Sequence, residues 1–231
     1  MKNYKMATKN GNKVIIVGGG KGGVGKSMVT MGVIDALLAK GEQVVLVEAD
    51  DSNPDTHKAL NKMVTSAICN IDHEDGYIAL GNIIEANKTA YVVVNSPARA
   101  TKGIIKHGGI LTDVVAEQKR ELVMLWPINR QRDSIELLKS FLDGTTGYSA
   151  TYVLKNTYFG AAEKFSRFDA SAQKNRVTGT IDYPELNDLL ADKINDNRLA
   201  FSNASEGLTI AERSVLTRFR NAVQNAFEVV L

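Results

Sequence analysis

Residues 18–27 read Gly18-Gly19-Gly20-Lys21-Gly22-Gly23-Val24-Gly25-Lys26-Ser27, and this stretch decides the fold. It contains the spacing G-x-x-x-x-G-K-S, which begins at Gly20 and ends at Ser27. An apolar run, Val14–Val17, precedes it, and helically spaced apolar residues follow it. Glycines let successive backbone N–H groups point at phosphate oxygens, and the start of a helix attracts anions. The stretch therefore predicts a phosphate-binding loop, and the flanking pattern disfavours a glycine-rich turn with a chance lysine.

The residues of this loop have distinct expected tasks. Lys26 should reach the β- and γ-phosphates of a nucleotide as a catalytic group. The Ser27 hydroxyl should ligate Mg²⁺, a hard cation that prefers oxygen. The residues expected to contact the nucleotide are Gly20, Lys21, Gly22, Gly23, Val24, Gly25, Lys26, Ser27 and Met28.

Short apolar runs alternate with helical patterns along the chain. Runs that are almost wholly apolar are typical of strands covered on both faces of a parallel sheet. Strand–helix alternation predicts an α/β fold with a doubly wound, mostly parallel sheet flanked by helices. With the phosphate-binding loop after its first strand, this arrangement resembles the P-loop NTPase fold. We expect a flexible arm over residues 1–12 and a single domain over residues 13–231. The strands are expected at Val14–Val17, Val44–Val47, Tyr91–Val94, Glu121–Trp126, Thr151–Leu154 and Val177–Ile181, and the helices at Ser27–Lys40, Gly76–Asn87, Gly103–Gln118, Asp133–Leu142, Pro184–Leu190 and Ile210–Phe227.

Composition narrows the class of protein further. The 231 residues are 44% hydrophobic and 23% charged, which is typical of a globular chain. The net charge of +2 predicts no general basic face for nucleic acid. Cys69 is the only cysteine, which excludes an intramolecular disulfide and a cysteine-built zinc site. No apolar stretch approaches the roughly 18 residues of a membrane span, and the N-terminus does not resemble a secretory signal. We therefore expect a soluble, cytoplasmic protein.

The loop carries a second lysine, Lys21. The string from Lys21 to Ser27, Lys-Gly-Gly-Val-Gly-Lys-Ser, resembles the deviant Walker A motif of the ParA/MinD family of P-loop ATPases. In that family the first lysine reaches the phosphates of a nucleotide held by a partner subunit. The resemblance implies ATP as the cofactor, a catalytic role for Lys21 and a homodimer that forms on ATP. The alternative is a solvated loop lysine.

Carboxylates follow the second apolar run. Glu48-Ala49-Asp50 resembles the Asp-x-Asp that ends this strand in the family, although the following proline is displaced to Pro54. The resemblance implies that Asp50 lies near Mg²⁺ and orients or deprotonates the attacking water. Asp51 remains an alternative because the proline is displaced. A second alternative is that these polar residues only form a turn and cap a helix over Asp55–Met63.

The run Tyr91–Val94 leads into Asn95-Ser96-Pro97 and resembles the Walker B strand. The family usually has an aspartate at the place of Asn95, where it holds a metal-bound water. Asparagine keeps an oxygen acceptor but loses the negative charge. We expect Asn95 to lie beside the metal and the protein to be a slow ATPase, a phosphoanhydride hydrolase. The alternative is an ATP-binding scaffold that does not hydrolyse.

Asn156 ends a late strand, where the resemblance implies a hydrogen bond to adenine. An asparagine that ends a strand is also a common turn residue. The turn at Tyr183-Pro184 is expected, again by resemblance, to frame the base. Asp133 or Ser134 is expected to cap the helix that follows residues 129–132.

Within the family, the short form with Asn-Ser-Pro-Ala at residues 95–98 and Asp-Gly-Tyr-Ile-Ala-Leu at residues 75–80 resembles the StbB-type proteins of plasmid stability and conjugation operons. This implies an ATP-dependent switch in plasmid partition, stability or positioning, with a partner protein encoded nearby and an association with the nucleoid. The alternative is a small-molecule ligase or kinase of the dethiobiotin synthetase type. Nonspecific DNA is a weaker partner, and a membrane is not expected because the apolar stripe of the last helix suits a core. The DNA hypothesis rests on a basic cluster with interleaved aromatics, Lys164, Phe165, Arg167, Phe168, Lys174 and Arg176.

Overall fold

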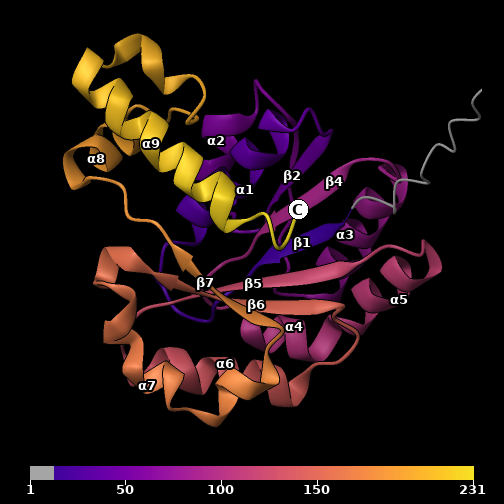
Figure 1. Cartoon of the computed structure of the whole chain (residues 1–231). Coiled ribbons are helices and arrows are strands. Elements are labelled where there is room, and N and C mark those ends of the chain that lie inside the picture. The colour runs from indigo at the N-terminus through magenta and orange to yellow at the C-terminus, as the bar shows by residue number, and fades with distance from the viewer. Residues whose placement is uncertain (1–12) are drawn as a thin grey trace, which may run out of the picture.

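The computed structural model describes residues 13–231, so the expected arm over residues 1–12 lies outside the described residues. Seven parallel strands form one sheet in the order β3-β2-β4-β1-β5-β6-β7 (Figure 1). The predicted doubly wound fold is confirmed, and the described sheet is parallel throughout. The strands are β1 (Val14–Val17), β2 (Val44–Glu48), β3 (Thr65–Ile68), β4 (Tyr91–Asn95), β5 (Leu122–Ile128), β6 (Ala150–Asn156) and β7 (Gly179–Tyr183).

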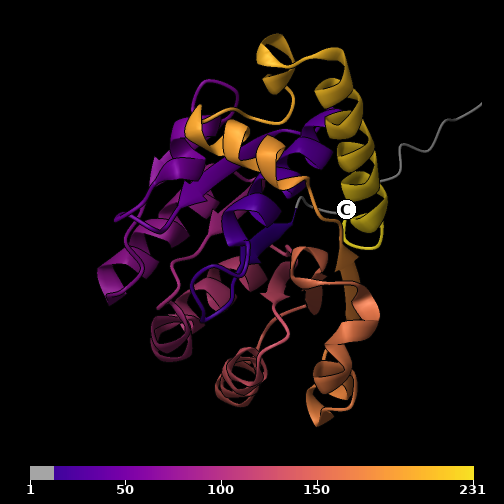
Figure 2. The same ribbon diagram turned by 90° about the vertical axis from the view of Figure 1, so that its left-hand side faces the viewer.

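Helices cover both faces of the sheet (Figures 1 and 2). Each face has its own apolar core, because side chains of a parallel strand alternate between the two faces. One face is covered by α1 (Lys26–Ala39), α2 (Asp55–Leu60), α8 (Asp188–Asp196) and α9 (Ile210–Ala226). The other is covered by α3 (Glu74–Ala86), α4 (Thr101–His107), α5 (Gly109–Glu117), α6 (Arg132–Gly144) and α7 (Ser166–Asp169).

Helix α1 is buried on all sides rather than only along an apolar stripe. Its residues from Val29 to Leu37 are all buried, because α9 packs against its outer side. Arg220 of α9 donates to the buried carboxylate of Asp35 at 2.8 Å. The helix ends at Ala39, and Gly41, the predicted stop signal, follows the C-cap Lys40 with a φ of +74°. The phosphate-loop helix is therefore buried between the sheet and α9.

The structure differs from the predicted elements in three main places: one strand was not predicted, and two helices have other bounds. The edge strand β3 was not predicted, because its sequence Thr-Ser-Ala-Ile has no apolar run and its side chains are at least partly exposed. The expected helix Gly103–Gln118 is divided at Gly108 into α4 and α5. Helix α8 begins at Asp188 rather than at Pro184, because the side chain of Asn187 caps it by accepting from the Leu190 N–H.

Helix α9 turns its apolar stripe inward, as predicted: Leu216, Phe219 and Val223 are buried in the core. Within residues 13–231, none of the helices has the length and apolar character needed to cross a membrane.

The carboxyl ends of the parallel strands share one edge of the sheet. Val17 of β1 pairs with Asn95 of β4, and Asn95 pairs with Glu48 of β2. The loops that follow these strands therefore start side by side, at the edge where open α/β sheets bind ligands.

Candidate nucleotide-binding site

The glycine-rich loop joins β1 directly to α1. Gly23 and Gly25 have φ angles of +70° and +95°, a region that side chains disfavour. A Cβ on Gly25 would also lie 2.4 Å from the Asn156 Nδ2 atom. The Gly25 carbonyl accepts from the Val29 N–H at 2.9 Å and begins the helix. The local sequence thus produces a tight turn that ends at a helix N-terminus.

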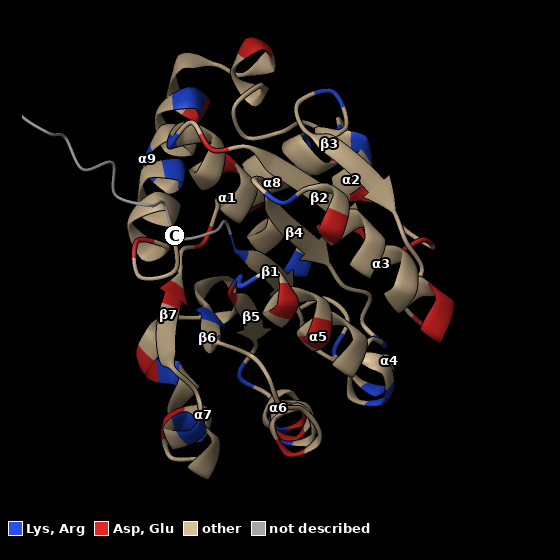
Figure 3. Cartoon of the chain, turned by 90° about the vertical axis from the view of Figure 1, so that its right-hand side faces the viewer, with Lys and Arg blue, Asp and Glu red and all other residues tan. Residues whose placement is uncertain are grey.

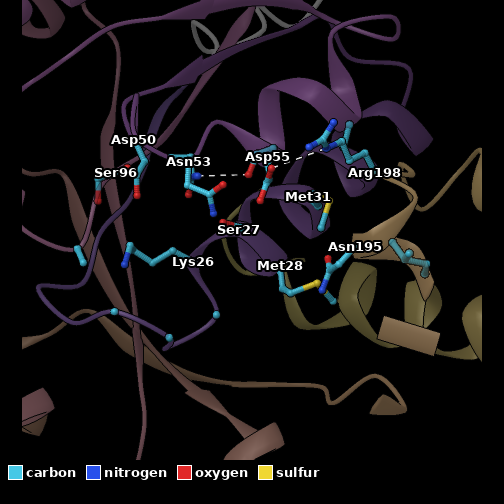
Figure 4. A pocket seen from close by; sticks show the side chains of 18 of the residues that line it. Lys26, Ser27, Met28, Met31, Asp50, Asn53, Asp55, Ser96, Asn195 and Arg198 are labelled. Carbon is cyan, nitrogen blue, oxygen red and sulfur yellow. Dashed lines mark hydrogen bonds and ion pairs between the residues drawn. The ribbon is translucent and has the colours of Figure 1, made fainter. Parts of the chain in front are cut away.

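Two neighbouring cavities open beside this loop. The main cavity, about 440 Å³, runs from the loop across the start of α1 toward α8. Figure 4 shows Lys26, Asp50 and Ser96 at one end of it, and Arg198 and Asn195 at the other. A second cavity of about 300 Å³ shares Gly23, Gly25, Met28 and Asn195 with the first. Clefts of this size accept small ligands.

Lys26 lines the main cavity. Its Nζ donates to the backbone carbonyl of Lys21 at 2.9 Å, which places the ammonium inside the curve of the loop. Burial lowers the pKa of Lys26, and the nearby charge of Asp50 opposes that shift. A partly desolvated cation inside a glycine-rich loop suits a polyphosphate.

Asp50 and Asp51 have different surroundings. Asp50 lines the main cavity, whereas Asp51 accepts from Asn70 at 2.7 Å and pairs with Arg99 at 3.3 Å. Of the two candidates for positioning a water, the structure brings Asp50 to the cavity. The capping alternative is wrong, because α2 begins after Pro54 without a side-chain cap.

Glu48 is a site residue that the sequence analysis did not select. It is fully buried, and burial raises its pKa to about 7. Asn95 Nδ2 donates to its Oε1 and Oε2 atoms at 2.9 and 3.2 Å. The signal in the sequence was a glutamate at the end of an otherwise apolar strand. Ser96, for which the sequence predicted no role, lines the main cavity, and its hydroxyl donates to the Val17 carbonyl.

Lys21 lines neither cavity. Its Nζ forms an ion pair with Asp133 Oδ2 at 2.6 Å and a hydrogen bond with the side chain of Gln131. This contact lowers the pKa of Asp133. The predicted cap of α6 is wrong, because Gln131 occupies the cap position and Ser134 donates to Asn129.

Asn156 braces the glycine-rich loop. Its Nδ2 donates to the Val24 carbonyl at 3.0 Å, and its Oδ1 accepts from the Tyr158 N–H at 3.2 Å. The residue also lines the second cavity, together with the predicted turn at Tyr183-Pro184. Contact between Asn156 and a base remains a prediction, since both halves of the amide already have protein partners.

The three residues expected near Mg²⁺ line one cavity: Ser27, Asp50 and Asn95. A hydroxyl, a carboxylate and an amide carbonyl are oxygen donors of the kind that Mg²⁺ accepts alongside phosphate oxygens. No cluster of three His, Cys, Asp or Glu side chains suited to a metal occurs among the described residues. The donor set therefore fits a metal that a nucleotide brings with it.

The basic and aromatic cluster is smaller than predicted. Phe165 and Phe168 are buried in the core, so they do not interleave with cations on the surface. Lys174 pairs with Asp169 at 3.3 Å, and Arg176 pairs with Asp143 at 2.7 Å. In Figure 3, acidic and basic residues are coloured close together along the ribbon of α6 and α7. The local charge is therefore largely balanced.

The arrangement agrees with the comparison with known families. The model of the CobQ/CobB/MinD/ParA nucleotide binding domain matches residues 15–222. The chain belongs to this family. Family membership confirms the predicted resemblance to the ParA/MinD family of P-loop ATPases.

Relatives of this CobQ/CobB/MinD/ParA-family chain cover most of its length. It is 40% identical over 222 residues to Protein MobD of Acidithiobacillus ferrooxidans, with 94% of this chain and 97% of the relative aligned. MinD in the MinC:MinD cell division protein complex of Aquifex aeolicus shares 19% identity and a TM-score of 0.51, over 90% of this chain and 94% of that one.

FtsY of Elizabethkingia anophelis in complex with GDP shares 16% identity and a TM-score of 0.53, over 78% of this chain and 58% of that chain. At these identities, the likeness to MinD and FtsY shows the P-loop NTPase fold alone.

Proposed function

We propose that this protein is an ATP-operated switch whose two copies associate when each holds ATP, and which then hydrolyses it slowly. The observation that carries the proposal is the position of Lys21. Its side chain leaves the loop away from both cavities, whereas Lys26 lies inside. A lysine placed outside its own site is available to a nucleotide on a second copy. A cation there would stabilise charge that develops during phosphoryl transfer.

The cavity residues divide the work of the proposed reaction. Lys26 and the loop N–H groups bind the phosphates, and Ser27 contributes an oxygen to Mg²⁺, which would neutralise phosphate charge when bound. Asp50 orients the attacking water, and Asn95 lies beside the metal. The second cavity takes the base, with the Tyr183-Pro184 turn on one side. The family assignment and the relationship to MobD support a ParA-like role.

The biological role that we propose is the partition, stability or positioning of a plasmid or other mobile DNA. It rests on the resemblance to StbB-type proteins, and it includes a partner protein that is encoded nearby. The small-molecule ligase is less well supported. Among the described residues that line the main cavity, the cationic ones are Lys26 and Arg198. Arg198 faces Asp55 at 3.9 Å, so an acidic substrate would have to compete for it.

Turnover by an Asp50→Asn variant tests the catalytic part of the proposal. We expect slow, Mg²⁺-dependent phosphate release from the wild type and a loss of about 100-fold in the variant, since a positioned base contributes at least that much. Asp51→Asn is the matched control and should keep wild-type turnover, because Asp51 contacts Asn70 and Arg99 outside the cavity. If the wild type releases no phosphate, the protein is better described as an ATP-binding scaffold that does not hydrolyse.

The contact between Lys21 and Asp133 predicts a latch that opposes association. Lys21 must leave Asp133 before it can reach another copy, so Asp133→Asn should promote dimer formation. An exposed ion pair contributes at most about 1 kcal/mol, and a dimer of two copies breaks two of them, so we expect the half-dimer protein concentration to fall by up to about 30-fold. Sedimentation with a slowly hydrolysed ATP analogue measures this. Asp143→Asn, which removes pairs with Lys139 and Arg176, is the control. Weaker association of Asp133→Asn than of wild type would contradict the latch.

A further inference from the structure

We propose that Glu48 is a positioning residue of the metal side of the site: it fixes the orientation of the Asn95 amide and the backbone of Asp50. This inference rests on the proposed nucleotide function and adds a residue to it.

The hydrogen bonds of Asn95 permit one orientation of its amide. Glu48 and Asn95 are paired across adjacent parallel strands and are 0% and 3% exposed. The Asn95 Nδ2 atom donates to both carboxyl oxygens of Glu48, so the NH₂ group of Asn95 faces Glu48. The amide oxygen then points the other way, where it accepts from the Thr30 hydroxyl at 3.1 Å. Glu48 therefore decides which atom of Asn95 faces helix α1.

The direction of this oxygen matches the expected metal position. Thr30 lies three residues after Ser27 on α1, and residues at this spacing share one face of a helix. The Asn95 oxygen is thus presented beside the turn that carries the Ser27 hydroxyl, and both residues line the main cavity. If Glu48 were absent, the amide could rotate and present its NH₂ group, which repels a cation.

The neutral side chain of Asn95 suits the place beside the buried Glu48 carboxyl group. An aspartate at 95 would place a second carboxylate within hydrogen-bond distance of buried Glu48, and like charges at that separation disfavour each other's ionisation. The Nδ2 of Asn95 also reaches the Thr56 hydroxyl of α2 at 3.3 Å. Glu48 Oε1 accepts from the Asp50 N–H at 3.1 Å, so the same carboxylate also fixes the backbone of Asp50. The side chain of Glu48 therefore contacts both the Asn95 amide and the Asp50 backbone.

Four full-length proteins test this inference: wild type, Glu48→Gln, Asn95→Asp and the double variant. The affinity for a fluorescent ADP analogue is measured above neutral pH, once with Mg²⁺ and once with EDTA. The ratio of the affinity in Mg²⁺ to the affinity in EDTA is called the Mg²⁺ enhancement. We expect the Mg²⁺ enhancement to fall about tenfold in Glu48→Gln, the effect typical of residues that orient metal ligands. The double variant, which returns a carboxylate at position 95, should recover to within about threefold of the wild type.

Stability in EDTA gives a second readout. Asn95→Asp alone should lower the melting temperature, and adding Glu48→Gln should restore it, because only one buried anion remains. Asp35→Asn is the matched control: it removes a buried carboxylate paired with Arg220, so it should lower stability and leave the Mg²⁺ enhancement unchanged.

An unchanged enhancement in Glu48→Gln, or a double variant no better than Glu48→Gln, overturns the inference. If the wild type does not bind the nucleotide, or binds it equally well without Mg²⁺, the proposed function fails as well. The wild-type result therefore distinguishes failure of the proposed function from failure of the Glu48 inference alone.

Discussion

Lys26→Ala is expected to weaken nucleotide binding by about 1000-fold. The ammonium lies inside the loop, where it would make two charge-assisted contacts with phosphate oxygens, and each is worth about 2 kcal/mol. Titration of a fluorescent ATP analogue measures the loss. Because the burial of Lys26 disfavours its charge, the alanine variant should melt at or above the wild-type temperature. Unfolding of Lys26→Ala would therefore be excluded as the cause of its lost nucleotide binding.

Lys40→Ala is the matched control for this experiment. Lys40 is exposed and lies just beyond the opposite end of the same helix, so its removal should leave nucleotide affinity unchanged. Affinity of Lys26→Ala within a few-fold of the wild type would show that the phosphates bind elsewhere.

Lys21→Ala is expected to separate binding from turnover. Since Lys21 lines neither cavity, the variant should bind nucleotide like the wild type. Its ATP turnover should fall about 1000-fold, the size of effect that a cation supplied in trans to phosphoryl transfer produces. Parallel binding titrations and phosphate-release assays measure the two quantities.

Arg132→Ala is the control for Lys21→Ala. Arg132 is an exposed cation beside Gln131 and Asp133, and it pairs with Glu136 on its own helix. Its removal should change neither binding nor turnover. If Lys21→Ala keeps wild-type turnover, or loses nucleotide affinity as strongly as Lys26→Ala, then Lys21 does not act on a partner's nucleotide.

The sequence predicted the features that follow from local physics. The glycines at positions 23 and 25 adopt the left-handed backbone that the loop pattern requires, and Lys26 and Ser27 begin the helix after it. The central strands were found because burial on both faces leaves long apolar runs. Edge strand β3 was missed for the converse reason: its residues are not fully buried, so selection for apolar character is weak.

The predictions that went wrong or were not made concern contacts between distant segments. Asp133 seemed suited to a helix cap, and nothing near it in sequence shows that Lys21, 112 residues away, takes its carboxylate. Asn156 likewise reaches Val24 through the sheet order, 132 residues back along the chain. The pairing of Glu48 with Asn95 required the strand register as well. Such contacts depend on topology, which local patterns do not contain.

The mass of the wild-type protein in solution tests the central claim most directly. Size-exclusion light scattering would be run with ADP, with ATP and with a slowly hydrolysed ATP analogue. The proposed switch predicts the mass of one chain with ADP and that of two chains with the analogue, and Lys21→Ala should remain at one chain in every state. A wild type that has the mass of one chain with every nucleotide would contradict the ATP-dependent dimer on which the proposed function depends.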